Sequence, residues 1–165
     1  MKTELMNWSV MQDVHDLGEK LGIYKGDFRL DICDHLLSAF EPIPRLAALQ
    51  VLFSEHPYYG RELRSFNQAP WWYHCRFDAG NLDGAAALLR FCSADYYCKV
   101  FLNGSLVGEH AGYFEAFEFD VTSLLQEKDN QLYVKVWAPW DTEILDGAEA
   151  ISCYSVNRDM VKGTY

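Results

Sequence analysis

Cationic residues are scarce in this sequence. Lysine and arginine together number 14 among 165 residues, against 24 aspartates and glutamates, so the net charge is −10 with neutral histidines. Binding to nucleic acid and to anionic membrane surfaces is driven by clustered cations. The charge balance therefore argues against nucleic acid and membrane as partners, and the length suits one domain with a single core.

Long apolar runs and several familiar motifs are also missing. No stretch approaches the ~18 apolar residues of a membrane span, and residues 1–4 lack the basic region and apolar run that open a secretory signal. A cytoplasmic and a periplasmic location both stay open. The sequence has no glycine-rich phosphate loop, HExxH motif or GxSxG motif. We therefore expect no cofactor.

Closely spaced metal ligands are absent. The five cysteines show no CxxC spacing, and the five histidines are scattered, so we assign no metal-ligating residues. A calcium or sodium site stays open, because carboxylate and carbonyl ligands leave no clear spacing in the sequence. Three cysteines lie inside apolar or aromatic stretches, where a free thiol behaves as a small buried hydrophobe. They are Cys75, Cys92 and Cys98.

Residues 1–70 mix two kinds of periodicity. Trp8, Val10 and Val14 alternate with polar residues, which predicts a half-buried strand, and a loose hairpin should then return to Ile23. Over residues 34–54, apolar side chains recur at helical spacing after prolines that suit a helix start. The prolines are Pro42 and Pro44, and the apolar side chains are those of Leu46, Leu49, Leu52 and Phe53. A second helical turn is expected at residues 61–66.

The hydrophobic pattern of residues 71–137 has a period of two. Apolar and aromatic side chains alternate with polar ones in short runs separated by turn residues, which predicts antiparallel strands. Asn103 and Gly104 form the strongest hairpin signal, because both tolerate the positive φ of a type I′ turn. Leu106 is expected to return over the core.

The spacing of these strands predicts the fold class. A short helical turn is expected at residues 120–125, and turn residues occupy the other gaps. The pattern is typical of an all-β fold, an antiparallel β-sandwich or jelly roll. We therefore predict a single domain of this class with one or two short N-terminal helices.

Aromatic residues, among them the Tyr96-Tyr97 pair and Trp137, exceed what one small core can hide. They make up 15% of the chain, and the adjacent Trp71 and Trp72 must point to opposite sides of their strand. The outward tryptophan has two interpretations. It covers a loop or an interdomain seam, or it stacks on the C–H face of a sugar ring.

Several segments carry the motifs of a known family in the right order. They are HPYYGREL at 56–63, WYHCRF at 72–77, FCSADYYCKVFLNGSLVGEH at 91–110, FEFDVTSLL at 117–125 and NQLYVKV at 130–136. Together they resemble the N-terminal sugar-binding domain of glycoside hydrolase family 2, in its β-galactosidase and β-mannosidase branches. The resemblance implies a galactose-binding-domain-like jelly roll, in agreement with the alternation.

The resemblance also implies a place in a multidomain enzyme of carbohydrate metabolism. Family members are retaining β-glycosidases whose two catalytic glutamates lie in a separate (β/α)8 barrel, held ~5 Å apart. A barrel takes roughly 250 residues, so this chain should bind sugar and act as a scaffold without catalysing hydrolysis alone. The expected partners are a β-glycoside substrate and the remaining domains of the parent enzyme.

Four residues are candidates for contacting the substrate, and none is expected to be catalytic. Asp159 resembles the position from which some family members send an aspartate to hold a sugar hydroxyl. Asn67 precedes the aromatic strand, and Trp140 and Asp141 lie on a loop at the end of the sheet. The sequence does not indicate which sugar or linkage is recognised.

The domain divides into an N-terminal elaboration (1–70), core strands (71–137) and a C-terminal segment (138–165). Family domains close with a G-(I/L)-(W/F) strand that residues 159–165 lack. We therefore expect the last segment to be truncated or completed by a partner, and an unpaired edge would favour a homo-oligomer. Two other functions stay open: a stand-alone carbohydrate-binding module and a jelly roll for protein interaction.

Overall fold

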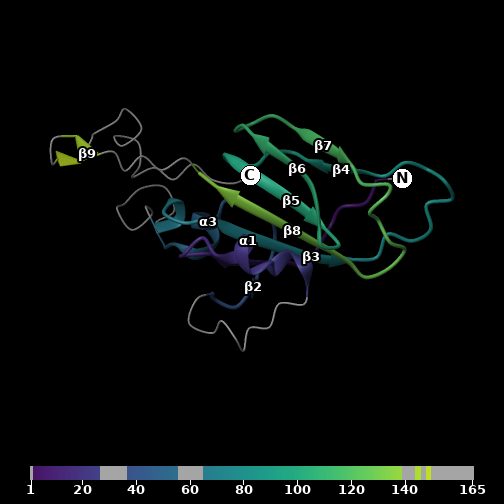
Figure 1. Cartoon of the computed structure of the whole chain (residues 1–165), viewed down its shortest axis with the longest axis horizontal. Coiled ribbons are helices and arrows are strands. Elements are labelled where there is room, and N and C mark those ends of the chain that lie inside the picture. The colour runs from purple at the N-terminus through teal and green to yellow at the C-terminus, as the bar shows by residue number, and fades with distance from the viewer. Residues whose placement is uncertain (1, 27–36, 56–64, 139–143, 146–147, 150–165) are drawn as a thin grey trace.

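The computed structural model describes residues 2–26, 37–55, 65–138, 144–145 and 148–149. A six-stranded antiparallel sheet in the order β2-β1-β3-β8-β5-β6 forms the main layer (Figure 1). Its strands are β1 (Trp8–Gln12), β2 (Glu41–Pro42), β3 (Trp71–Phe77), β5 (Tyr97–Leu102), β6 (Ser105–Ala111) and β8 (Asn130–Trp137).

A smaller sheet lies against the inner face of the main sheet. It pairs β4 (Leu88–Phe91) with β7 (Phe117–Asp120) and lies beside β6 (Figure 1). The strands β9 (Ile144–Leu145) and β10 (Ala148–Glu149) pair with each other. Two packed antiparallel sheets confirm the predicted all-β sandwich.

The core between the sheets follows the predicted alternation. Cys75, Val100 and Leu132 lie on the inner face of the main sheet and have no exposed surface. Phe91 and Phe119 of the smaller sheet pack against this cluster. Side chains of one parity are therefore removed from water, which is the main stabilising contribution in a sandwich.

The outer face of the main sheet is covered by the N-terminal segment. Helix α1 (Gly18–Leu21) and the 3₁₀ helix η1 (Ile23–Lys25) lie across it (Figure 1). The Tyr24 ring stacks on Phe101 with centroids 4.2 Å apart, and Ile23 packs in the same cluster as Trp72. The prediction of a loose hairpin that returns to Ile23 is therefore wrong, because this segment is helical.

Side-chain capping explains this difference. The carboxylate of Asp13 accepts hydrogen bonds from the backbone N–H groups of Leu17 and Gly18, at 2.9 and 2.7 Å. Such bonds satisfy the free donors of a first helical turn. Gly22, with φ of 70°, then ends α1 in the left-handed conformation.

The amphipathic helix is shorter than expected. Helix α3 spans Leu49–Phe53, and Leu46 before it is exposed. Pro42 belongs to β2 at the edge of the main sheet, where a missing N–H is tolerated. Most of the turn expected at 61–66 lies outside the described residues.

The hairpin between β5 and β6 confirms the strongest local prediction. Asn103 and Gly104 have φ of 50° and 81°, the signs that a type I′ turn requires. Leu106 lies opposite Phe101 and is 52% exposed, and a β-bulge in β6 follows, in which the extra residue Val107 packs against the core instead. The expected position of Leu106 over the core is therefore wrong.

The turn after β7 also agrees with the sequence. One carboxylate oxygen of Asp120 accepts hydrogen bonds from both the N–H and the hydroxyl of Thr122, at 2.9 and 2.6 Å. The N–H of Leu124 then donates to the carbonyl of Val121. Asp120 thus initiates a short turn of helical type.

The cysteine prediction holds for two of three thiols. Cys75 and Cys98 are buried and free, and burial raises the pKa of each thiol to about 11. Cys92, directly after β4, is exposed, so the prediction is wrong for that residue. No helix within the described ranges is long and apolar enough to span a membrane.

Candidate functional site

Aromatic side chains gather at the end of the main sheet where β8 finishes. Trp137 lies opposite Tyr97, the first residue of β5, and Tyr97 lies opposite Ala111, the last residue of β6. The loops beside these strand ends bring further rings. We call the resulting group the aromatic end and define it as Tyr96, Tyr97, Tyr113, Phe114 and Trp137.

The rings of the aromatic end form a connected series. Tyr97 stacks on Trp137 at 5.4 Å between centroids and meets Tyr96 edge-on at 4.6 Å. Tyr96 contacts Tyr113 at 4.6 Å, and Tyr113 contacts Phe114 at 6.0 Å. Phe114 is 80% exposed and Tyr97 is 37% exposed. These two residues are therefore the most exposed members of the aromatic end.

Asn67 lies at the same end of the main sheet. It is half-buried and comes four residues before Trp71, which pairs with Val136 next to Trp137. The segment containing Asn67 is held in place because the Trp71 indole donates to the carbonyl of Phe66 at 2.9 Å. Trp140, Asp141 and Asp159, the other candidate contacts, lie outside the described residues.

Neither Trp71 nor Trp72 provides the exposed ring that the sequence suggested. Trp71 packs between Phe53 and Phe66, with stacked rings at 6.1 and 5.9 Å. Trp72 points to the opposite face, as predicted, but is 0% exposed beneath the N-terminal segment. Of the two interpretations of the outward tryptophan, stacking on a sugar is therefore excluded, because α1 and η1 add a layer on that face.

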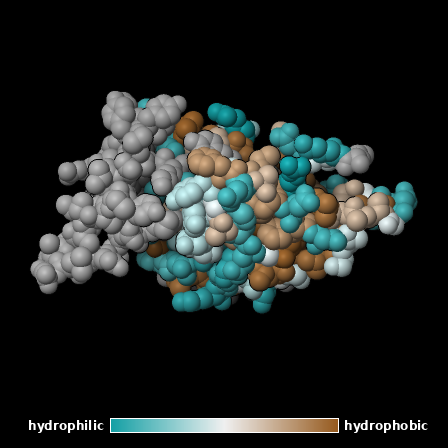
Figure 2. All heavy atoms as spheres, turned by 90° about the horizontal axis from the view of Figure 1, so that it is seen from above, coloured by the Kyte–Doolittle hydropathy of each residue, from teal (hydrophilic) through white to brown (hydrophobic). Residues whose placement is uncertain are grey.

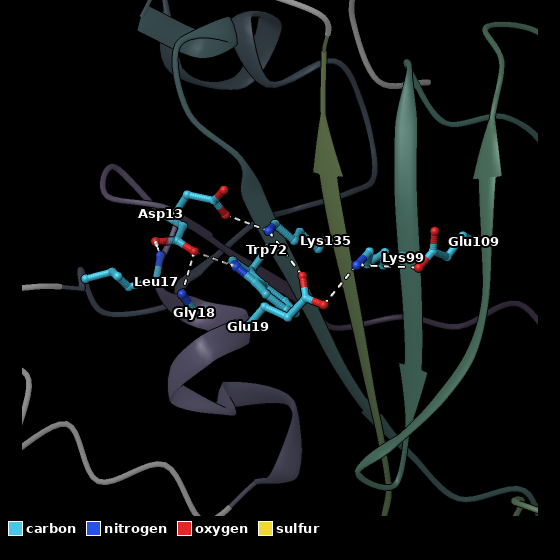
Figure 3. A network of polar contacts seen from close by, with 9 residues as sticks. Asp13, Leu17, Gly18, Glu19, Trp72, Lys99, Glu109 and Lys135 are labelled. Carbon is cyan, nitrogen blue, oxygen red and sulfur yellow. Dashed lines mark hydrogen bonds and ion pairs between the residues drawn. The ribbon is translucent and has the colours of Figure 1, made fainter.

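A buried polar network joins α1 to the outer face of the main sheet (Figure 3). At its centre is Asp13, which has no exposed surface and accepts a hydrogen bond from the Trp72 indole at 3.0 Å. Gly18 fits here because a Cβ atom would lie 2.6 Å from that indole nitrogen and 2.8 Å from the Asp13 carboxylate. The contacts position the helix and leave the carboxylate no room for a substrate.

Two lysines extend the network toward the aromatic end (Figure 3). Lys135 is nearly buried and contacts Asp16 at 2.6 Å and Glu19 at 3.4 Å. Its ammonium group also lies 5.4 Å from the centre of the Trp137 ring. Lys99 contacts Glu19 at 2.9 Å and Glu109 at 3.4 Å. Both cations are therefore engaged by carboxylates of the chain itself.

The protonation behaviour of these groups matches ion pairing. Burial alone would raise the pKa of Glu19, but the hydrogen bonds and charges of Lys99 and Lys135 outweigh it and leave the pKa lowered. The hydrogen bond to Glu19 raises the pKa of Lys99, against a smaller opposing effect of burial. Glu19 is thus ionised at neutral pH and is unsuited to act as a general acid.

Two of the three histidines within the described ranges, His74 and His110, pack against aromatic rings, whereas His15 is exposed. His74 stacks on Tyr133 at 4.4 Å and shares a 2.8 Å hydrogen bond with Gln131. Burial lowers the pKa of His74. His110 stacks on Phe117 at 3.9 Å. Among the residues that the structure describes, no group of three or more His, Cys, Asp or Glu side chains could hold a metal ion.

The sequence indicates part of this arrangement. It marked Trp137 and the Tyr96-Tyr97 pair as aromatic residues in excess of the core, but it assigned no role to Tyr113, Phe114 or the lysines. The signal for Lys99 and Lys135 is their position at outward sites of strands that are otherwise largely apolar. A lysine at an outward position of a strand indicates a buried ion pair only if the segment that covers that face of the sheet is also known.

Comparisons with known proteins agree with this architecture. A sequence model of the family described as "Glycosyl hydrolase 2 galactose-binding domain-like" matches residues 46–159. A search of curated protein sequences gave no match.

Solved structures give the same picture of the fold. A β-glucuronidase of Ruminococcus gnavus is similar at 23% identity and a TM-score of 0.64, with 93% of this chain and 23% of that protein covered. The complexes of a β-glucuronidase from that organism with D-glucuronic acid and with uronic isofagomine are similar at 20% and 21% identity, both with a TM-score of 0.64. Each match covers 90% of this chain, but it covers only 26% of the chain in the first complex and 24% of the chain in the second. The chain thus spans about a quarter of these structures.

Proposed function

The chain belongs to the glycosyl hydrolase 2 galactose-binding-domain-like family, and from this premise we propose that it is the N-terminal sugar-binding and scaffolding domain of a multidomain retaining β-glycosidase. The observation that carries the proposal is the family match over residues 46–159, which includes most of both sheets. The similar structures are about four times longer than this chain, which leaves room in the parent enzyme for a separate catalytic domain.

The described carboxylates support a non-catalytic role for the chain itself. Retaining hydrolysis needs one carboxyl group that donates a proton and a second that attacks the sugar, ~5 Å apart. Glu19 and Glu109 approach the same lysine, but the pKa of Glu19 is lowered by its ion pairs. Asp13 is enclosed by three donors. These groups are suited to structural roles.

We propose a β-galactoside or a β-mannoside as the substrate of the parent enzyme. The motifs of residues 56–63 are similar to those of the β-galactosidase and β-mannosidase branches. A β-glucuronide is the third candidate, because the similar structures are β-glucuronidases. An enzyme assay distinguishes these three candidates.

The test compares the complete product of the source gene with the 165-residue chain. Each is incubated with nitrophenyl β-galactoside, β-mannoside and β-glucuronide, and the anomer released is identified by proton NMR. We expect the complete product to hydrolyse one substrate with retention and the 165-residue chain to hydrolyse none. Turnover by the short chain, inversion, or an inactive complete product would contradict the proposal.

A further inference from the structure

We propose that Asn103 is a self-modification site, whose carboxamide deamidates when the turn between β5 and β6 opens and whose product fits the closed turn less well. Asn103 is followed by Gly104, whereas the other five asparagines of the chain precede larger residues. Glycine has no Cβ atom, so it leaves its backbone nitrogen accessible to the preceding side chain. This chemistry needs no catalytic residue and is independent of the proposed function.

The reaction exchanges one carbon–nitrogen bond for another within the chain. The backbone nitrogen of Gly104 attacks Cγ of Asn103, and the new bond closes a cyclic imide. The bond from Cγ to Nδ2 breaks, and Nδ2 leaves as ammonia with the proton that the Gly104 nitrogen gives up. Water then opens the imide at either of its carbonyl groups, which gives aspartate or isoaspartate. Water is the only co-reactant, and nothing is oxidised or reduced.

Hydrogen bonds engage the Asn103 carboxamide in the folded chain. Nδ2 donates to the carbonyl of Leu124 at 2.8 Å and to Oδ1 of Asn130 at 2.9 Å. Oδ1 of Asn103 accepts from the N–H of Gln131 at 2.8 Å. Both donors of the leaving nitrogen and the carbonyl oxygen at the attacked carbon are thus in use. We therefore expect the reaction to proceed from chains in which this turn has opened.

A carboxylate in place of this carboxamide would face two acceptors. It cannot donate, yet the carbonyl of Leu124 and Oδ1 of Asn130 both lie where Nδ2 of Asn103 now donates. Asn130 cannot turn its amide to supply a donor, because its own Nδ2 already donates to the carbonyls of Phe77 and Gln126, at 3.3 and 2.7 Å. Asn130 has no exposed surface, so water does not relieve the repulsion between these oxygens.

Isoaspartate would also change the length of the turn. Asn103 and Gly104 form the complete loop between the paired residues Leu102 and Ser105. Isoaspartate adds one carbon atom to the main chain of this loop, and loop length fixes the register of a hairpin. The turn lies close to η1, since a Cβ atom on Gly104 would be 3.7 Å from Cα of Lys25. Both products should therefore destabilise the closed turn.

The modification makes unfolding difficult to reverse. The folded chain presents a surface on which hydrophilic and hydrophobic residues are interspersed, as the face in Figure 2 shows. Unfolding instead exposes the apolar side chains of the core and releases Asn103 for reaction, and chemical change of an unfolded chain limits its recovery. A deamidated chain refolds to a less stable state and unfolds more often, so the loss of folded chain reinforces itself.

Peptide mass spectrometry of the 165-residue chain tests the site. The chain is incubated in mildly alkaline buffer with and without urea and then digested, and chromatography separates aspartate from isoaspartate. In urea we expect Asn103 to react faster than Asn81, because Asn81 is followed by leucine. Omission of urea should slow the reaction of Asn103 at least about tenfold, since it then waits for opening.

Substitutions measure what the product does to stability. Asn103→Asp should lower the urea midpoint and raise the unfolding equilibrium constant about thirtyfold, a typical effect of one buried polar group left unsatisfied. Asn81→Asp is the matched control, because Asn81 is exposed and its Oδ1 accepts from the N–H of Asp83 at 2.9 Å, a role that a carboxylate keeps. It should leave the midpoint unchanged. Asn103→Ser keeps one donor and removes the reacting amide, so it should abolish the modification and cost less stability than Asn103→Asp.

The opposite results overturn the proposal. It fails if Asn103 and Asn81 react equally fast in urea, if omission of urea does not slow Asn103, or if Asn103→Asp and Asn81→Asp have equal midpoints. An Asn103→Asp chain that does not fold, beside an Asn81→Asp chain that does, supports the expected loss of stability. The reaction rates of the unsubstituted chain then decide whether the site is used.

Discussion

A single buried carboxylate organises the outer layer of this protein. Asp13 is fully removed from water, yet it accepts hydrogen bonds from two backbone N–H groups and from the Trp72 indole. Burying a charge without partners is costly, so each of these three donors is needed. The residue therefore decides whether residues 13–22 form a helical turn against the sheet.

Substitution of Asp13 tests this role. Asp13→Ala should lower the free energy of unfolding by about 3 kcal/mol, because it leaves three buried donors unsatisfied. Trp72→Phe keeps most of the packing and should cost about 1 kcal/mol through the lost hydrogen bond. Urea unfolding followed by circular dichroism measures both changes.

Asp16→Ala provides the matched control for Asp13→Ala. Asp16 lies on the same segment, but its side chain is 61% exposed and bonds only to Lys135 among the contacts described. An effect of Asp16→Ala as large as that of Asp13→Ala would contradict the central role of the buried carboxylate.

Residue-level prediction from the sequence succeeded where local conformation alone was decisive. The positive φ of Asn103 and Gly104 is an intrinsic tolerance of those residue types, and the structure has it. The exposure of Trp72 could not be predicted in the same way. Alternation places its side chain on the outer face correctly, but whether water reaches that face depends on residues of the N-terminal segment that lie far away in the sequence.

Helix α1 is attached to the main sheet mainly by ion pairs and hydrogen bonds. Glu19 on α1 contacts Lys99 of β5 and Lys135 of β8, so one side chain connects the helix to two adjacent strands. A helix of four residues has little stability by itself. The element therefore depends on these tertiary contacts.

The lowered pKa of Glu19 gives this attachment a defined pH dependence. Because the folded-state pKa lies below the ordinary 4.5, the stabilisation is complete above about pH 4.5 and is lost as pH falls through the folded value. Glu19→Gln should therefore destabilise the chain at pH 7, and the difference from the unmodified chain should vanish toward pH 2. Thermal unfolding across this pH range measures the effect.

A carboxylate on the other sheet serves as the control for Glu19→Gln. Glu118 on β7 is exposed, so Glu118→Gln should leave the pH profile almost unchanged. Equal profiles for the two variants would show that ion pairing at Glu19 contributes nothing specific.

The ion pair of Lys99 is sensitive to high pH instead. Because the pKa of Lys99 is raised above its ordinary 10.5, its contribution to the free energy of unfolding is complete below pH 10.5. That contribution is lost as pH rises through the folded-state pKa.

The whole molecule has three layers in the described part: the smaller sheet, the main sheet and the N-terminal helical segment. Both faces of the main sheet are covered, one by β4 and β7 and the other by α1, η1 and Phe40. Surface available for a ligand is therefore concentrated at strand ends and loops. This is the geometric reason why the aromatic end, and not a sheet face, is the candidate site.

The net charge of −10 disfavours binding of the whole molecule to polyanions such as nucleic acid. We expect the chain to show no binding to double-stranded DNA in fluorescence polarisation at 50 mM salt, because too few cations are available to release counterions from phosphates. A lysozyme-like basic protein would serve as the positive control for the assay. Salt-sensitive binding in the micromolar range would contradict this expectation.

The sequence alone determined the fold class, the main strands and the family, because alternation, turn residues and ordered motifs are local properties that each segment carries. Only the tertiary structure decided which faces are covered and which side chains act together. Asp13 and Glu19 lie far along the chain from their partners Trp72, Lys99 and Lys135, and these pairings follow from the way that the N-terminal segment folds back over the sheet. Burial and ion pairing are properties of that arrangement in space, so the positions of the candidate site and of its charges could not be derived from the order of residues.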